Sequence, residues 1–303
     1  MPMDERRLPA ILGPTAVGKT ELSLTLAEQL DAEIISADSR QIYRPLTIGT
    51  AKPSPEELAR VPHHFIDELE LDEPFSAGRF AEAANARITE IIGRGRVPLI
   101  VGGSTLYLEA LLHGLAEVPP TTEATRRWLM ARLKVEGPER LFDELVSLDP
   151  SSAATMDPTK SQRIVRALEV YMDTGKPLSF YHEHKPRPPY RFTPVVLTRP
   201  RAELYDRINR RVDAMLASGL LDENRGLLAA GYAPDVNPLR TIGYREPIAY
   251  LQGGLEYEEM VRRLKQNSRR YAKRQLTWFR RRPEYRWIDL SVAGAEKAML
   301  LFQ

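Results

Sequence analysis

Cysteine is absent from this chain of 303 residues. Its absence excludes disulfide bonds, zinc sites with cysteine ligands and thiol catalysis, and it fits a reducing compartment. No apolar run approaches the roughly 18 residues that a membrane-spanning helix needs. The short charged segment 1–9 is not followed by the apolar stretch of a signal peptide. We therefore expect a cytoplasmic protein with no membrane partner.

An excess of charge of one sign is also missing. The net charge is only +2, so a nucleic-acid partner would have to bind local basic patches rather than the charge of the whole molecule. Hydrophobic residues make up 43% of the chain and charged residues 28%, which is ordinary for a globular protein. A chain of this length has room for one large domain or two, each with a buried core.

The strongest motif is a phosphate-binding loop near the N-terminus. The segment reads G-P-T-A-V-G-K-T and matches the pattern G-x-x-x-x-G-K-[ST]. An apolar strand, 10–12, precedes it, and a helix with regularly spaced leucines, 21–30, follows it. This context disfavours a chance match in a glycine turn. Loop amides, the helix N-terminus and the lysine would bind phosphate, and the threonine hydroxyl would bind Mg²⁺. We predict binding of a phosphate or pyrophosphate, carried by a nucleotide such as ATP or by another molecule, by Gly13, Pro14, Thr15, Ala16, Val17, Gly18, Lys19 and Thr20, with Mg²⁺ at Thr20.

Strands and helices alternate through the first third of the chain. After the phosphate loop, the predicted elements are strands at 33–37 and 97–101 and helices at 77–93 and 106–112. Such alternation predicts an α/β fold, a P-loop type of parallel sheet flanked by helices. Ligands of these sheets bind at the C-terminal ends of the strands. We therefore expect the phosphate loop, Asp38 and the glycine turn 102–104 to share one crevice.

The alternation is interrupted by a helical segment. Residues 119–193 show helical periodicity and no convincing strand, and a proline-rich linker, 186–189, lies near their end. We predict a mainly helical insertion domain, 119–193, within a P-loop core formed by 1–118 and 194–303. A single continuous domain with a few extra helices is the alternative. The last predicted elements are a strand at 194–198, helices at 203–217 and 257–281, and a closing edge strand at 287–290.

Asp38 lies where the second predicted strand ends, beside the phosphate loop. Three roles are open for it: it could bind Mg²⁺ through water, act as a general base toward an acceptor, or cap the next turn. The surrounding segment, 36–43, is rich in hydrogen-bonding groups and ends in a tyrosine. That composition suits recognition of a nucleobase edge with stacking.

The last predicted helix is strongly basic. The segment from Val261 to Arg282, both included, contains ten Lys and Arg residues and no acidic residue. A solvated helix ordinarily mixes both signs to form i,i+4 pairs. This composition therefore favours contact with an anionic polymer over a solvated face. We expect the interleaved aromatics Tyr271, Trp278 and Phe279 to anchor the helix in the core rather than to stack on bases.

Seven segments follow one another in a recognisable order. They are G-P-T-A-V-G-K-T, S-A-D-S-R-Q-I-Y, I-G-T-A-K-P, V-P-H-H-F-I-D, V-G-G-S-T-L-Y, Q-R-I-V-R-A-L-E-V and T-I-G-Y-R-E. Over nearly its whole length the chain thereby resembles the bacterial tRNA dimethylallyltransferases, also called tRNA isopentenyltransferases. It departs from the family at Ser104, where threonine is usual. A hydroxyl remains there, so we expect a retained contact with less packing.

The resemblance implies transfer of a dimethylallyl group from dimethylallyl diphosphate to N6 of the adenosine beside the anticodon, position 37 of tRNA, with release of diphosphate. Lys19, Arg211 and Mg²⁺ near Thr20 would stabilise the charge that gathers on the departing diphosphate. Thr15 would contact the diphosphate, and Asp38 would accept the proton of N6. The target adenine would have to leave its stack. The implied partners are dimethylallyl diphosphate and a tRNA anticodon stem-loop, bound by a monomer.

The resemblance also implies tRNA contacts from the core, the helical insertion and the bend at 240–245. The implied residues are Asp38, Ser39, Arg40, Gln41, Ser104, Arg126, Gln162, Arg163, Ile164, Val165, Arg166, Arg240, Thr241, Ile242, Gly243, Tyr244 and Arg245.

Two other functions remain open from the residues alone. A small-molecule kinase would use the phosphate loop with ATP and Asp38 as the base toward an alcohol, but the basic helix argues against it. An ATP-dependent RNA-binding protein would keep the basic surface. It would also need an acid placed to activate water, and the sequence offers no clear candidate.

Overall fold

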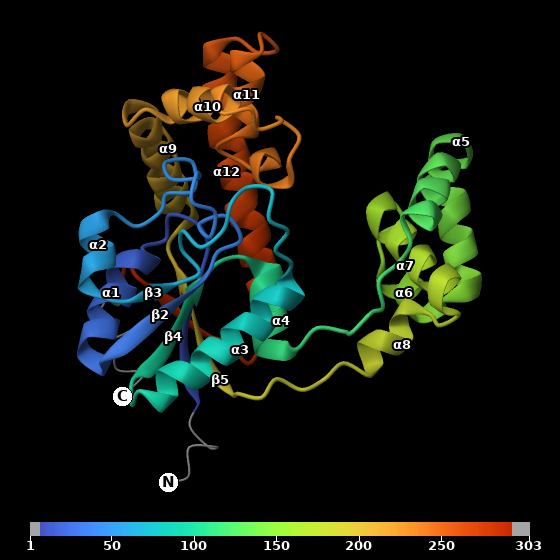
Figure 1. Cartoon of the computed structure of the whole chain (residues 1–303), viewed down its shortest axis with the longest axis horizontal. Helices are drawn as coiled ribbons and strands as arrows, with labels where there is room; N and C mark the ends of the chain where they lie inside the picture. Colours follow the sequence, from blue (N-terminus) through green and yellow to red (C-terminus); the bar gives the residue numbers. More distant parts are fainter. Residues whose placement is uncertain (1–6, 293–303) are drawn as a thin grey trace. The chain divides into compact units, whose positions relative to one another are not determined.

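The computed structural model describes residues 7–292, and the ends of the predicted core, 1–6 and 293–303, lie outside them. The described strands form one parallel sheet in the order β3-β2-β4-β1-β5-β6. Figure 1 labels β2, β3, β4 and β5 of this sheet. The predicted α/β fold with a parallel sheet is therefore confirmed. The strands are β1 (Leu8–Leu12), β2 (Ala32–Ala37), β3 (His63–His64), β4 (Val97–Gly102), β5 (Phe192–Thr198) and β6 (Arg286–Asp289).

The central strands are buried along their length because helices cover both faces of the sheet. Every residue of β1 and β2 is buried, as expected of strands inside a parallel sheet. β1 lies between β4 and β5, so that Ala10 is paired with both Ile100 and Pro194. This register brings the phosphate loop after β1 beside the glycine turn after β4.

Helices of the core unit pack against this sheet. The side chains of Leu26 in α1, Leu204 in α9 and Ala272 in α12 join one apolar cluster with the strands. Figure 1 shows α9 to α12 gathered together, and each of these helices contacts another of the group. The helices of this unit are α1 (Lys19–Leu30), α2 (Pro55–Arg60), α3 (Ala77–Gly93), α4 (Thr105–His113), α9 (Arg201–Ala217), α10 (Leu220–Ala229), α11 (Arg245–Leu251) and α12 (Tyr257–Phe279).

Residues 113–188 form a second compact unit. It has its own core, in which Leu129, Leu145, Ile164 and Leu168 are fully buried. The long helix α5 is broken at Gly137, where φ is 81° and the next residue is proline. The strand β5 begins at Phe192, two residues earlier than expected, because Phe192 pairs with Leu8. The helices of this unit are α5 (Glu123–Leu148), α6 (Pro150–Thr155), α7 (Ser161–Thr174) and α8 (Leu178–Glu183).

The sequence prediction omitted α2, α10, α11 and β3. These elements have six, ten, seven and two residues, which leaves little room for a periodic pattern. The predicted closing strand is present as β6 at one edge of the sheet. Within residues 7–292, no helix combines the length and the apolar character that crossing a membrane requires.

Candidate active site

The phosphate loop connects β1 to α1. Its turn places Ala16 and Gly18 at positive φ, 63° and 112°, and Gly18 immediately precedes the first turn of α1. The Lys19 ammonium folds back over the loop and donates to the carbonyls of Gly13, at 3.0 Å, and Pro14, at 2.9 Å. An ammonium has three donors, so one is left for an anion in front of the helix N-terminus.

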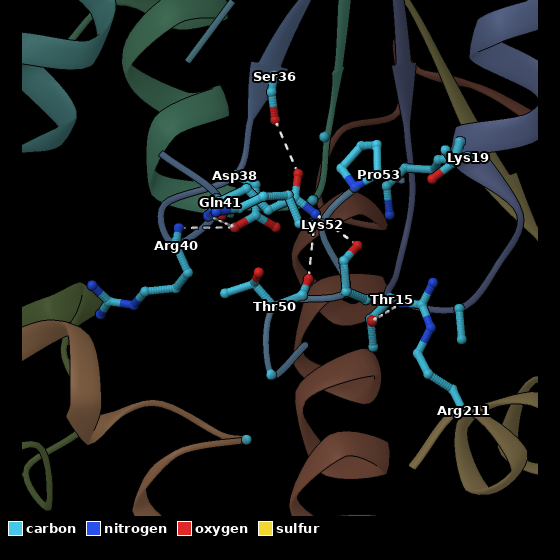
Figure 2. A pocket seen from close by; sticks show the side chains of 18 of the residues that line it. Thr15, Lys19, Ser36, Asp38, Arg40, Gln41, Thr50, Lys52, Pro53 and Arg211 are labelled. Atoms are coloured by element: carbon cyan, nitrogen blue, oxygen red, sulfur yellow. Dashed lines mark hydrogen bonds between the residues drawn. The ribbon is translucent and has the colours of Figure 1, made fainter. Parts of the chain in front are cut away.

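Two cations lie side by side at this loop. Burial and the neighbouring Arg211 guanidinium lower the pKa of Lys19 to about 8, against an opposing effect of Asp38. Burial and Arg207 likewise lower the pKa of Arg211. The Nη1 of Arg211 donates to Oγ1 of Thr15 at 3.2 Å (Figure 2). Lys19, Arg211 and Arg207 thus form a group of neighbouring, partly desolvated cations, and a multiply charged anion placed among them would relieve their repulsion.

Two further arginines donate hydrogen bonds to carbonyl groups of the loop. The Nε of Arg207, on α9, donates to the Ala16 carbonyl at 2.9 Å, and the Nε of Arg199, just before α9, donates to the Val17 carbonyl at 2.8 Å. Neither arginine was among the site residues predicted from the sequence. The four-residue spacing of Arg207 and Arg211, which puts both on one face of α9, was the available signal.

Asp38 lines the same cavity as the phosphate loop. Its Oδ1 accepts the backbone N–H groups of Arg40, at 2.9 Å, and Gln41, at 3.3 Å. The turn-capping role is therefore present. It occupies one carboxylate oxygen and fixes the orientation of the group (Figure 2). The second oxygen is available for another role, so capping does not exclude a general base.

The segment after Asp38 is held from two sides. The Ser39 amide donates to Oγ of Ser104 at 3.0 Å, so the hydroxyl at this position makes a contact although the methyl group of threonine is absent. The Gln41 side chain donates to the Ala51 carbonyl at 3.1 Å. Tyr43, in contrast, is buried at 3% exposure. The expectation of a stacking tyrosine at the end of 36–43 is wrong, because this ring packs inside the protein.

The bend at 240–245 closes another side of the cavity. Thr241, Ile242 and Gly243 line it. Tyr244 is fully buried, and its hydroxyl donates to Glu223 at 2.7 Å, so its side chain is structural and not a contact surface for RNA. Both arginines of this bend form ion pairs. Nη2 of Arg240 lies 3.4 Å from Oδ2 of Asp235, and Nε of Arg245 lies 2.7 Å from Oε1 of Glu246.

The helical unit carries the other predicted tRNA contacts. Arg126, on α5, and Arg166, on α7, converge on the fully buried carboxylate of Glu169, at 3.1 and 3.4 Å. Gln162 and Arg163 are exposed. Ile164 and Val165 are fully buried in the core of this unit. The expectation that these two side chains contact tRNA is therefore corrected, because they face inward on α7.

Acidic residues neutralise part of the charge of the basic helix. Arg262 and Arg263 both bind Glu259, one turn earlier, at 2.6 Å, and Lys265 binds Asp213 of α9 at 2.6 Å. Beyond them, basic side chains remain exposed with no ion pair among residues 7–292. Phe279 anchors the helix in the core as expected, whereas Tyr271 lines the cavity. The exposed basic residues are Arg270, Lys273, Arg274, Arg280 and Arg281.

These groups share one cavity of about 780 Å³. It runs from the phosphate loop, past Asp38 and Arg211, to the bend at 240–245, as the single crevice expected from the sheet. Volumes of 300–1,000 Å³ are typical of ligand sites. Residues 7–292 contain no cluster of three or more His, Asp or Glu side chains suited to a metal ion. Thr20 and Asp38 both line the cavity, which fits Mg²⁺ held by few protein ligands together with phosphate oxygens and water.

Known proteins resemble this chain over most of its length. The family model described as IPP transferase matches residues 41–282. A tRNA dimethylallyltransferase of Salinibacter ruber is 60% identical over 94% of this chain and 89% of its own length. A tRNA dimethylallyltransferase 1 of Pelobacter propionicus is 49% identical over 93% and 92%.

Solved structures agree with this assignment. The full-length tRNA isopentenylpyrophosphate transferase of Bacillus halodurans is 43% identical, with a TM-score of 0.73 over 98% of this chain and 95% of that one. A eukaryotic dimethylallyltransferase acting on tRNA is 27% identical, with a TM-score of 0.78 over 97% and 78%. These matches do not favour the kinase and ATP-dependent alternatives. The chain therefore belongs to the IPP transferase family, the family of the tRNA dimethylallyltransferases.

Proposed function

We propose that this protein transfers the dimethylallyl group of dimethylallyl diphosphate to N6 of the adenosine beside the anticodon of a tRNA, releasing diphosphate. The observation that carries the proposal is the single cavity in which the phosphate loop, Arg211 and Asp38 meet. Its volume is enough for a short diphosphate ester together with a nucleobase. We further propose that the enzyme works in the cytoplasm as a monomer.

The cationic end of the cavity would bind the diphosphate. Cleavage of the allylic C–O bond leaves its electron pair on the diphosphate, so negative charge grows there in the transition state. Lys19, Arg211 and the loop amides are fixed before the reaction, which lets them stabilise this charge without reorganisation. Thr15 is held against Arg211 and would contact the same group. Mg²⁺ held by Thr20 and phosphate oxygens would supply additional positive charge when bound.

The opposite side of the cavity would bind the acceptor. The N6 lone pair of adenine is conjugated with the ring, so nucleophilic attack requires loss of a proton from N6. Asp38 is oriented by the Arg40 and Gln41 amides, and its second oxygen would accept that proton as the N6–C bond forms. A base in this position accelerates such a step by roughly 10²–10⁴-fold. An adenine within an anticodon loop must leave its stack to enter.

Three groups of residues would hold the tRNA. The first is the turn 38–41 with Ser104, at the acceptor side of the cavity. The second is the helical unit 113–188, through Arg126, Arg166 and the exposed start of α7. The third is the set of exposed basic residues on α12 and directly after it, which suits contact with the RNA backbone. The bend at 240–245 would complete the cavity around the base.

An incubation with an unmodified tRNA transcript tests the proposal. One arm contains dimethylallyl diphosphate with Mg²⁺ and the other contains ATP with Mg²⁺. We expect one adenosine to gain a dimethylallyl group in the first arm, detected by mass spectrometry of the nucleosides, and no change in the second. Absence of the product in the first arm, or phosphate transfer in the second, would contradict the proposal.

A further inference from the structure

One face of α12 forms a wall of the cavity. Leu264, Ser268, Tyr271 and Gln275 line it, at successive spacings of four, three and four residues, which is the repeat of one helical face. Tyr271 hydrogen bonds with Ser104, and burial raises its pKa to about 12. Gln275 is the last of the four and lies at the phosphate loop. The function proposed above assigns no role to it.

The Gln275 side chain joins two loops. Its Oε1 accepts the backbone N–H of Thr15 at 3.0 Å, and its Nε2 donates to the Gly103 carbonyl at 2.8 Å. Thr15 follows β1 and Gly103 follows β4, and these strands are neighbours in the sheet. One partner is a donor and the other an acceptor, so a side chain that both accepts and donates is required.

The fit around this amide is close. Gln275 is 2% exposed. A Cβ atom added to Gly103 would lie 2.5 Å from Nε2 of Gln275 and 2.8 Å from the Gly13 carbonyl. Glycine at 103 therefore lets the amide reach between the loops. The amide joins the two loops through direct hydrogen bonds, so the spacing between the loops depends on this side chain.

Thr15 connects Gln275 to the groups that would contact the diphosphate. Gln275 fixes the Thr15 backbone, and Thr15 Oγ1 accepts from Arg211 at 3.2 Å. A displacement of Thr15 would therefore move the contact of Arg211, whose charge must face the departing diphosphate. Misplacement of a stabilising group by about 1 Å costs on the order of 10²-fold in rate.

We propose that Gln275 is a positioning residue for the transfer reaction. It holds the phosphate loop against the glycine turn and thereby orients Thr15 and Arg211 toward the diphosphate. The proposal rests on the function proposed above. It predicts that loss of the two hydrogen bonds slows the chemical step more than it weakens the binding of either substrate.

The first test compares Gln275→Met, which keeps the length and removes both hydrogen bonds, with Gln266→Met. Gln266 lies on the same helix, is half-buried and does not line the cavity. Single-turnover rates are measured with saturating tRNA and dimethylallyl diphosphate, and dissociation constants are measured separately. We expect Gln275→Met to be about 10–100-fold slower with both dissociation constants within a few-fold of wild type. Gln266→Met should match wild type.

Gln275→Glu provides a second test that does not depend on the first variant folding. An ionised glutamate can accept from Thr15 but cannot donate to Gly103, whereas a protonated one can do both. The ratio of the variant rate to the wild-type rate should therefore rise as the pH falls. A side chain whose hydrogen bonds do not affect the reaction would give a ratio that does not change with pH.

The outcomes separate the two proposals. If wild type transfers no dimethylallyl group, the proposed function fails and the role of Gln275 falls with it. If wild type transfers the group, a Gln275→Met rate within about twofold of wild type overturns the positioning role alone. A Gln275→Glu ratio that is constant with pH also overturns it, and decides the question if the Met variant lacks a cooperative melt.

Discussion

The lowered pKa of the phosphate-loop lysine makes diphosphate binding sensitive to alkaline pH. The pKa of Lys19 falls from 10.5 to about 8 because the ammonium is buried and lies near Arg211. A bound diphosphate favours the charged ammonium and raises this pKa again. The bound enzyme therefore holds more protons than the free enzyme above about pH 8, and by linkage the affinity must fall as the pH rises.

The size of the effect follows from the titration. With a pKa of about 8, about nine-tenths of Lys19 is charged at about pH 7 and about one-tenth at about pH 9. The dissociation constant for dimethylallyl diphosphate should thus rise about tenfold between these values, if only the charged form binds. The phosphate groups are almost fully ionised throughout this range. Calorimetry without tRNA measures the constant, since no transfer consumes the ligand.

The control is Lys19→Arg, whose guanidinium stays charged throughout. Its dissociation constant can differ from that of wild type, but it should not vary over the same range of pH. A wild-type constant that stays level from neutral to alkaline pH would refute the reasoning. So would an equal rise in Lys19→Arg, because the titrating group would then lie elsewhere.

Three further predictions concern the acceptor side and the RNA. Asp38→Asn should slow single-turnover transfer by roughly 10²–10⁴-fold and leave tRNA affinity within a few-fold, because the amide can accept the turn hydrogen bonds but not a proton; near wild-type turnover would exclude the base. Replacing Arg270 and Lys273 together by Gln should reduce the log–log salt dependence of tRNA binding by about 1–2. Arg263→Gln removes a cation that is already paired with Glu259, so it should change the salt dependence less per residue replaced. An equal change per residue would mean that the ion pair does not keep Arg263 from contacting the RNA. Replacing residues 113–188 by a short flexible linker should leave a core that melts cooperatively and binds dimethylallyl diphosphate but has lost most of its tRNA affinity. A core without a cooperative melt would show that the two units fold as one.

Local patterns in the sequence predicted the parts of the fold that are themselves local. The phosphate loop is a contiguous motif, and α3 has the predicted bounds, 77–93. The order of strand and helix was sufficient to predict a parallel sheet. The same order predicted that Asp38 and the glycine turn would meet the phosphate loop, because parallel strands end at one edge.

The parts that sequence analysis missed depend on distant residues. Gln275 and Thr15 are separated by 260 positions, and the carboxylate of Glu223 accepts the amide of Gly49 across 174 positions. No periodicity or spacing links such pairs, because the fold alone brings them together. A similar limit explains Ile164 and Val165, since a matching motif does not tell which of its side chains turn inward on α7.

The basic helix shows how the two kinds of information combine. Its composition predicted contact with an anionic polymer. Neighbouring elements neutralise part of its charge, as Asp213 of α9 does for Lys265. The sequence did not show which residues of the helix face the cavity and which face solvent. The buried face carries Gln275 to the phosphate loop, while Arg270 and Lys273 remain exposed. A rigid helix moves as one body, so contacts that order its basic face also restrict the motion of the residues on its cavity face. The same helix would thus bind the RNA backbone with one face and, through Gln275 on the other, hold the phosphate loop in place.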